Sequence, residues 1–213
     1  VQIRSSNDLI SRKNRAINRA YYSGPLIVLQ NRLSASASEI FAGAIQDYGR
    51  GLVVGSRSFG KGTVQAMAPL TFGQLKLTES KFYRVSGEST QNKGVVPDIK
   101  LPSAYRNDDV GESAYDRALP WDSIHGVPHA RYEQIGQLVS PLKRLHDKRI
   151  ASNPDFVFFD EQIAMINESN DRQYISLNLV ARQQQKQDWE ARALKIENDR
   201  RGAKSLPLYA NYA

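Results

Sequence analysis

Short apolar runs separated by turn residues divide the first hundred positions of the chain into strands and one helix. Leu26–Leu29 is a continuous apolar run after Gly24-Pro25, which predicts a strand buried on both faces. Apolar residues then recur at helical spacing over residues 37–48, and Gly49 ends that pattern. A second apolar strand follows at residues 51–55. This succession predicts a parallel βαβ unit with a right-handed crossover.

Further strands and then helices are predicted along the rest of the chain. Residues 63–68 and 75–85 have the alternating pattern of half-buried strands, and residues 94–99 form a short extended piece. From about residue 131 the spacing of apolar residues becomes helical, and three helices are predicted, over residues 131–150, 155–168 and 177–201.

Changes in composition suggest three regions. Residues 1–105 contain the predicted strands, and within them residues 1–23 are polar and basic, as in a loop or a short helix. Residues 106–130 are rich in Pro, Gly, Asp and Ser and are predicted to be a linker. Residues 131–213 then form a helical C-terminal domain. The expected fold class is therefore mixed α/β, with a βαβ core followed by helices.

The net charge of +7 is concentrated in the first part of the chain. Residues 1–100 carry 14 Lys and Arg against 6 Asp and Glu. A nucleic-acid surface is one interpretation, but no aromatic stacking pattern accompanies these charges, and a solvated basic segment without a nucleic-acid partner is preferred. Much of the excess comes from five residues near the start, Arg4, Arg12, Lys13, Arg15 and Arg19.

Composition also excludes several classes of site. The chain has no cysteine, so disulfides and cysteine metal sites are excluded. His125 and His129 are four residues apart, but Gly126 and Pro128 argue against a helical metal-binding pair, and no metal is expected. No apolar run approaches the ~20 residues of a membrane span.

The residues with the clearest chemical potential are Ser36 and Lys61. Ser36 begins a capping box with Glu39 at the start of the predicted helix, which is by itself a sufficient structural role for this serine. The same position suits a nucleophile, because free backbone N–H groups at a helix start, such as that of Ala37, stabilise developing negative charge.

The βαβ geometry predicts that these two residues meet. The helix leads away from Ser36, and the strand over residues 51–55 returns, so Lys61 in the following loop reaches the same edge of the sheet. A lysine buried there would have a lowered pKa and could act as a general base without histidine. Gln65 could orient its amine, since Gly60 and Gly62 allow the chain to bend.

A phosphate-binding loop is the competing interpretation of the segment around Lys61. Residues 55–63 nearly match the pattern G-x-x-x-x-G-K-[ST] after a strand. However, Gly62 occupies the hydroxyl position, and the segment after it is predicted to be extended. No helix N-terminus would therefore face a phosphate, and a nucleotide binder is the weaker hypothesis.

The motifs Ser34–Ile40 and Phe59–Gln65 closely resemble those of the carboxyl-terminal processing proteases, and in particular the tail-specific group of Gram-negative bacteria. The resemblance covers roughly residues 24–200. Further matching stretches are Gln46–Arg50, Lys81–Val85, Lys93–Ile99, Ala118–Asp122 and Ile175–Asn178.

This resemblance implies a role for each matching residue. Ser36 corresponds to the nucleophile, Lys61 to the general base, and Gln65 to the residue that hydrogen-bonds this lysine. Ala37 corresponds to an oxyanion donor through its backbone N–H. Asp47 corresponds to an aspartate implicated in activity, although a structural role at the helix end suits its position at least as well.

The resemblance also implies the wider setting of the protein. It implies part of a ββα-type protease domain in residues 1–105, a serine endopeptidase without cofactors, and protein or peptide substrates with apolar C-terminal residues. It further implies a periplasmic location, compatible with peripheral association with the inner membrane. The chain is expected to be a C-terminal fragment that lacks the PDZ module and part of the oxyanion hole. The alternative from another class is a non-catalytic module that binds substrates or an adaptor protein through its helical half.

Overall fold

A computed structural model describes residues 1–8, 10–12 and 20–212 of the chain, which form two compact units, Val1–Lys143 and Arg144–Ala213. The basic residues Lys13, Arg15 and Arg19 lie outside the described residues. Within the described ranges, no helix has the length and apolar character needed to cross a membrane.

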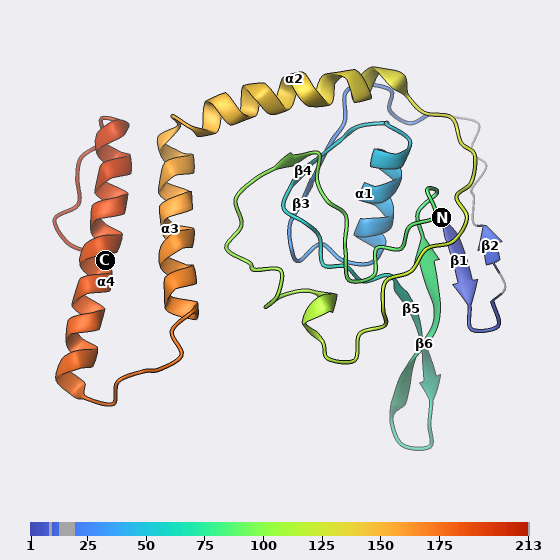
Figure 1. Cartoon of the computed structure of the whole chain (residues 1–213), viewed down its shortest axis with the longest axis horizontal. Coiled ribbons are helices and arrows are strands. Elements are labelled where there is room, and N and C mark those ends of the chain that lie inside the picture. The colour runs from blue at the N-terminus through green and yellow to red at the C-terminus, as the bar shows by residue number, and fades with distance from the viewer. Residues whose placement is uncertain (9, 13–19, 213) are drawn as a thin grey trace. The chain divides into compact units, whose positions relative to one another are not determined.

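The predicted βαβ unit is present in the first unit (Figure 1). β3 (Ile27–Gln30) leads to α1 (Ala37–Asp47), and β4 (Leu52–Gly55) returns parallel to β3. β7 (Ile99–Lys100) adds a third parallel strand, so the strand order is β3-β4-β7. The carboxyl ends of these three strands therefore lie at one edge of the sheet, where open α/β sheets place their ligands.

The core of this unit lies between α1 and the parallel sheet. Ala42 from α1, Val53 from β4 and Val95 are buried together, and Val28 of β3 packs against them. The prediction that β3 is buried on both faces is wrong for the described structure. Ile27 and Leu29 are 60% and 76% exposed, because β3 is the edge strand and these side chains point away from the core.

A second, antiparallel sheet has the strand order β2-β1-β6-β5. It contains β1 (Gln2–Ser5), β2 (Ile10–Arg12), β5 (Thr63–Pro69) and β6 (Gln74–Tyr83). The two later strands were predicted, but the prediction of a loop or helix for the start of the chain is wrong. β1 is stabilised by pairing with β6, about 80 residues away, and such a tertiary partner leaves no local pattern.

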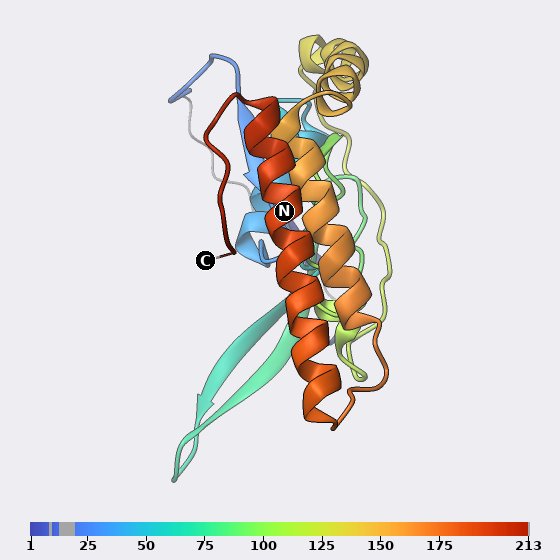
Figure 2. The same cartoon turned by 90° about the vertical axis from the view of Figure 1, so that its left-hand side faces the viewer.

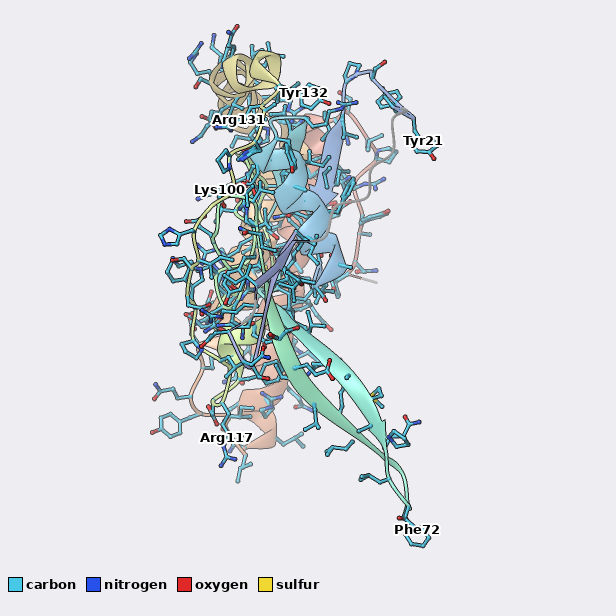
Figure 3. The ribbon with its side chains drawn as sticks, turned by 90° about the vertical axis from the view of Figure 1, so that its right-hand side faces the viewer. Tyr21, Phe72, Lys100, Arg117, Arg131 and Tyr132 are labelled. Atoms are coloured by element: carbon cyan, nitrogen blue, oxygen red, sulfur yellow. The ribbon has the colours of Figure 1, made fainter. Side chains whose placement is uncertain are left out.

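The β5–β6 hairpin extends away from the body of the first unit (Figure 2). Its tip carries Phe72, which is 93% exposed (Figure 3). The hairpin root begins at Thr63, directly after the loop that contains Lys61. One end of β5 is thereby fixed next to the predicted catalytic lysine.

The irregular segment after β7 packs on the first unit. It contains a 3-10 turn, Glu112–Ala114. The Trp121 indole N–H donates to the Ser89 carbonyl at 2.9 Å. The Asp122 carboxylate accepts hydrogen bonds from Arg4, Lys81 and Tyr83. Residues predicted to be a linker therefore contribute directly to the structure around the antiparallel sheet.

All three predicted C-terminal helices are present. They are α2 (Glu133–Ile150), α3 (Pro154–Asn170) and α4 (Leu179–Ala203). In the second unit, α3 and α4 pack side by side (Figure 1). Met165 and Ile196 are buried there, and the Asp155 carboxylate pairs with Arg200 and Lys204. The mixed α/β class with a helical C-terminal part is confirmed.

Candidate active site

Ser36 is the N-cap residue of α1 and has an unusual backbone conformation. Its φ and ψ angles are 58° and −112°, in a region that non-glycine residues seldom occupy. Such a conformation costs on the order of 1–3 kcal/mol and is characteristic of residues held in place for function. Its carbonyl accepts from the N–H groups of Glu39 and Ile40, which closes the first helical turn.

The Glu39 carboxylate connects the loop of Ser36 with the loop of Lys61. Oε2 accepts from the Ser36 N–H at 2.7 Å and from the Lys61 N–H at 2.9 Å. Because both donors reach the same oxygen, their nitrogens are no farther apart than the sum of these two distances. Oε1 accepts from the Gly60 N–H at 2.7 Å and the Ser58 hydroxyl at 2.6 Å. The two loops are therefore joined at a single carboxylate.

Glu39 is completely buried, and no basic side chain donates to it in the hydrogen bonds of the described residues. Burial raises the pKa of Glu39, while its hydrogen bonds from Ser58 and from the three backbone N–H groups act in the opposite direction. These four donors replace the water that a carboxylate needs, which is why the group can be accommodated in the interior.

The Lys61 side chain is half-buried, and its amine is oriented by Gln65. Lys61 Nζ donates to Gln65 Oε1 at 2.9 Å. Gln65 is the third residue of β5, and its amide nitrogen lies 3.5 Å from Thr78 Oγ1 on β6. The structure thus brings Lys61 and Gln65 into the contact expected from the sequence.

The loop before Lys61 requires glycine at residue 60. Gly60 has φ of 94°, and a Cβ atom there would lie 3.0 Å from the backbone of Asn92. After Lys61 the chain enters strand β5 rather than a helix. This observation counts against the phosphate-loop interpretation, which needs a helix N-terminus at that point.

A buried arginine, Arg32, holds the loop that carries Ser58 in place beside Glu39. Arg32 is 1% exposed and donates to the carbonyls of Ser58, Val110 and Asn107. The Ser58 hydroxyl donates to Glu39 and accepts from the Val95 N–H at 2.6 Å. A continuous set of hydrogen bonds therefore runs from Arg32 through Ser58 to Glu39.

Asp47 lies at the other end of α1, about 16 Å along the helix axis from Ser36. Its carboxylate is bound side-on by Arg84, whose Nε lies 3.1 Å and 3.0 Å from the two carboxylate oxygens. Arg84 also donates to the Gln46 side chain at 3.0 Å. The described structure therefore gives Asp47 a contact that anchors the end of α1 to the end of β6.

A pocket of about 500 Å³ lies beside the amine of Lys61. Its lining includes Ala35, Phe59 and Gln65, which come from the loops of Ser36 and Lys61 and from the start of β5. The lining also includes Tyr115 and Leu119 of the irregular segment after β7. Its size is within the range of small-molecule and peptide side-chain sites.

Sequence reasoning located Ser36, Ala37, Lys61, Gln65 and Asp47, but it missed the residues that hold them. The sequence identified Glu39 only as a capping residue, and its three-residue spacing from Ser36 was the signal that the two residues interact. Arg32, Ser58 and Arg84 gave no local signal, because their partners are distant in the sequence.

The contact between Asp47 and Arg84 predicts a coupled effect on stability. Replacing Asp47 by Asn, or Arg84 by Met, is expected to lower the free energy of unfolding by about 1–3 kcal/mol, since each leaves a largely buried charge without its partner. Urea denaturation of both single variants and the double variant measures this coupling. We expect the double variant to be much less destabilised than the sum of the single effects. Additive losses would contradict a direct structural pairing.

Two families match consecutive parts of the chain. Residues 2–101 match the family described as Peptidase family S41, and residues 105–213 match the C-terminal domain of tail specific protease.

Individual relatives are similar over different parts of the chain. The tail-specific protease of Haemophilus influenzae is 44% identical over 84% of this chain and 28% of its own length. The carboxy-terminal-processing protease of Bartonella bacilliformis is 51% identical over 42% of this chain and 22% of its own length. A solved photosystem II D1 C-terminal processing protease is 42% identical, covers 39% of this chain and 22% of its own, and has a TM-score of 0.35.

The chain thus spans less than a third of the length of these relatives. Residues 2–101 and residues 105–213 nevertheless match two families whose descriptions both name proteases. The second match covers more than half of the chain. The chain therefore belongs to the tail-specific, carboxyl-terminal processing proteases, and its residues 2–101 match Peptidase family S41.

Proposed function

We propose that Ser36 and Lys61 form the catalytic dyad of a serine endopeptidase. The observation that carries this proposal is the shared carboxylate of Glu39, which binds the backbone N–H of both residues. A strained serine at a helix start and a lysine amine held by Gln65 are the parts that serine–lysine hydrolysis requires.

In the proposed mechanism, Ser36 Oγ attacks the scissile carbonyl while the neutral amine of Lys61 accepts the hydroxyl proton. The Ala37 N–H is the first of α1 and has no partner within the helix, so it is available to the developing oxyanion. The proton on Lys61 then passes to the leaving amine. Water subsequently hydrolyses the acyl-enzyme: Lys61 accepts a proton from that water and passes it to Ser36 Oγ as the acyl bond breaks, which restores both residues.

We further propose that the whole protein acts in the periplasm on proteins with apolar C-terminal residues, with the helical half available for an adaptor protein. The names of the relatives support processing at carboxyl termini. The chain covers 28% of the length of the Haemophilus influenzae relative.

The pocket beside Lys61 is proposed to receive a side chain of the substrate next to the cleaved bond. Tyr115 and Leu119 contribute exposed apolar surface to its lining, together with Phe59. These residues contact no part of the dyad in the described hydrogen bonds. They would therefore affect which peptide binds more than how fast the bound peptide reacts.

Replacing Ser36 or Lys61 by Ala in the full-length protein is expected to lower the turnover of a peptide with an apolar C-terminus by about 10³-fold or more. Each change removes a group needed for bond formation, and because both residues are only half-buried, we expect the circular dichroism spectrum to stay unchanged. Matched controls are Ser38→Ala, two residues along α1, and Lys76→Ala on β6. Proteolysis retained by either dyad variant would overturn the proposal.

A second prediction concerns the pocket wall. Leu119→Ala is expected to raise KM by about 3- to 30-fold with little change in kcat, because the lost apolar contact is present before and during reaction. Steady-state kinetics with a peptide substrate separates these constants. Leu177→Ala, a 99% exposed leucine of the second unit, is the control. An unchanged KM would remove Leu119 from the substrate site.

A further inference from the structure

A second cavity, of about 480 Å³, lies at the carboxyl edge of the parallel sheet. Ser56 and Arg57 follow the end of β4, and Lys100 is the last residue of β7. Lys61, Gln65 and the pocket wall at Leu119 do not line this cavity. It is therefore a separate site, at the edge where open parallel sheets bind ligands.

The lining of this cavity is strongly basic. Arg32, Arg57, Lys100 and Arg106 face it, whereas Asp108 is its only acidic lining residue among those described. Arg57 and Lys100 are exposed, and Lys100 is labelled at the surface in Figure 3. Arg106 lies 3.3 Å from Asp109, so that carboxylate offsets part of its charge. Basic residues therefore outnumber acidic ones in the described lining by four to one.

The pKa of the buried Arg32 responds to the positive charge around the cavity. Burial lowers the pKa of Arg32, and the nearby positive charge of Arg57 lowers it further. Asp108 and Glu39 act in the opposite direction and do not compensate fully. Like charges gathered around a cavity favour the binding of an anion, which would relieve their repulsion.

An unsatisfied hydroxyl adds a second, independent feature. Ser56 Oγ is buried and has no hydrogen-bond partner in the described structure. Its backbone is fixed, since the Ser56 N–H donates to the Gln30 carbonyl at 3.2 Å and the Ser56 carbonyl accepts from the Gln30 side chain at 2.9 Å. Buried polar groups of this kind usually have a partner, and an oxyanion would accept a hydrogen bond from this hydroxyl.

We propose that this cavity binds a free phosphate-class oxyanion, with Arg57, Lys100 and Ser56 as its principal contacts. Two basic side chains and a hydroxyl are the donors that a doubly charged oxyanion accepts from, and the guanidinium of Arg57 can offer two parallel N–H groups. The volume leaves room for water around the ion.

Binding at this position would also stabilise the dyad loops. Arg57 precedes Ser58, which donates to Glu39, and Arg32 donates to the Ser58 carbonyl. An anion that holds Arg57 would therefore restrict the same loop that presents Lys61. This inference does not depend on proteolysis, since it concerns binding at residues outside the dyad.

Isothermal titration calorimetry with inorganic phosphate tests the proposal. The titration uses the full-length Ser36→Ala protein at pH 7.5 and low salt, so that proteolysis does not interfere, with sodium chloride of matched ionic strength as the reference anion. We expect saturable binding of one phosphate per chain that chloride does not reproduce. Binding should weaken as ionic strength rises, because both contacts with Arg57 and Lys100 are near the surface.

Variants distinguish a specific phosphate site from general attraction of phosphate to a basic protein. Arg57→Gln combined with Lys100→Gln is expected to weaken phosphate binding at least 10-fold, and Ser56→Ala at least 3-fold. Lys76→Gln combined with Lys143→Gln removes the same charge from exposed positions elsewhere on the first unit and should leave the affinity unchanged. Absence of saturable binding, or an equal loss in both double variants, would overturn the proposal.

Discussion

The buried carboxylate of Glu39 is the interaction on which the candidate active site depends. It accepts from the backbone of Ser36, Gly60 and Lys61 and from the hydroxyl of Ser58. These residues belong to two loops that the βαβ unit brings to one edge of the sheet. Loss of this acceptor would leave three buried N–H groups unpaired, each at a cost of about 1–3 kcal/mol. The same group therefore stabilises the fold and sets the relative position of the proposed nucleophile and base.

The two ends of α1 have different roles in this account. The first turn presents Ser36 in a strained conformation and offers the Ala37 N–H, whereas the last turn is anchored by the pairing of Asp47 with Arg84. A helix fixed at its far end holds its N-terminus in a constant position. An aspartate distant from the reaction can thus influence activity through the placement of the helix, without touching the substrate.

Local patterns were sufficient to predict α1, the strands β4, β5 and β6, and the pairing of Lys61 with Gln65, because each depends on nearby residues. They failed where a distant partner decides the structure. β1 depends on its pairing with the distant β6, and Ile27 and Leu29 are exposed because they point to the face of β3 opposite the core that Val28 contacts. The hydrogen bonds of Glu39 could not be predicted in full for the same reason. The spacing of a capping box indicates one of the four, the bond from the Ser36 N–H.

Hydrogen–deuterium exchange of the Glu39→Gln variant is the direct test of whether the Glu39 carboxylate holds the loops of Ser36 and Lys61 together. Glutamine preserves the volume of the side chain but replaces one acceptor oxygen by a donor group. The account predicts faster exchange at residues 58–61 and at Ser36, while the amides of β4 keep the protection they have in the parent protein. Unchanged exchange at residues 58–61 and Ser36 would show that the two loops are held by other contacts, and would contradict the account.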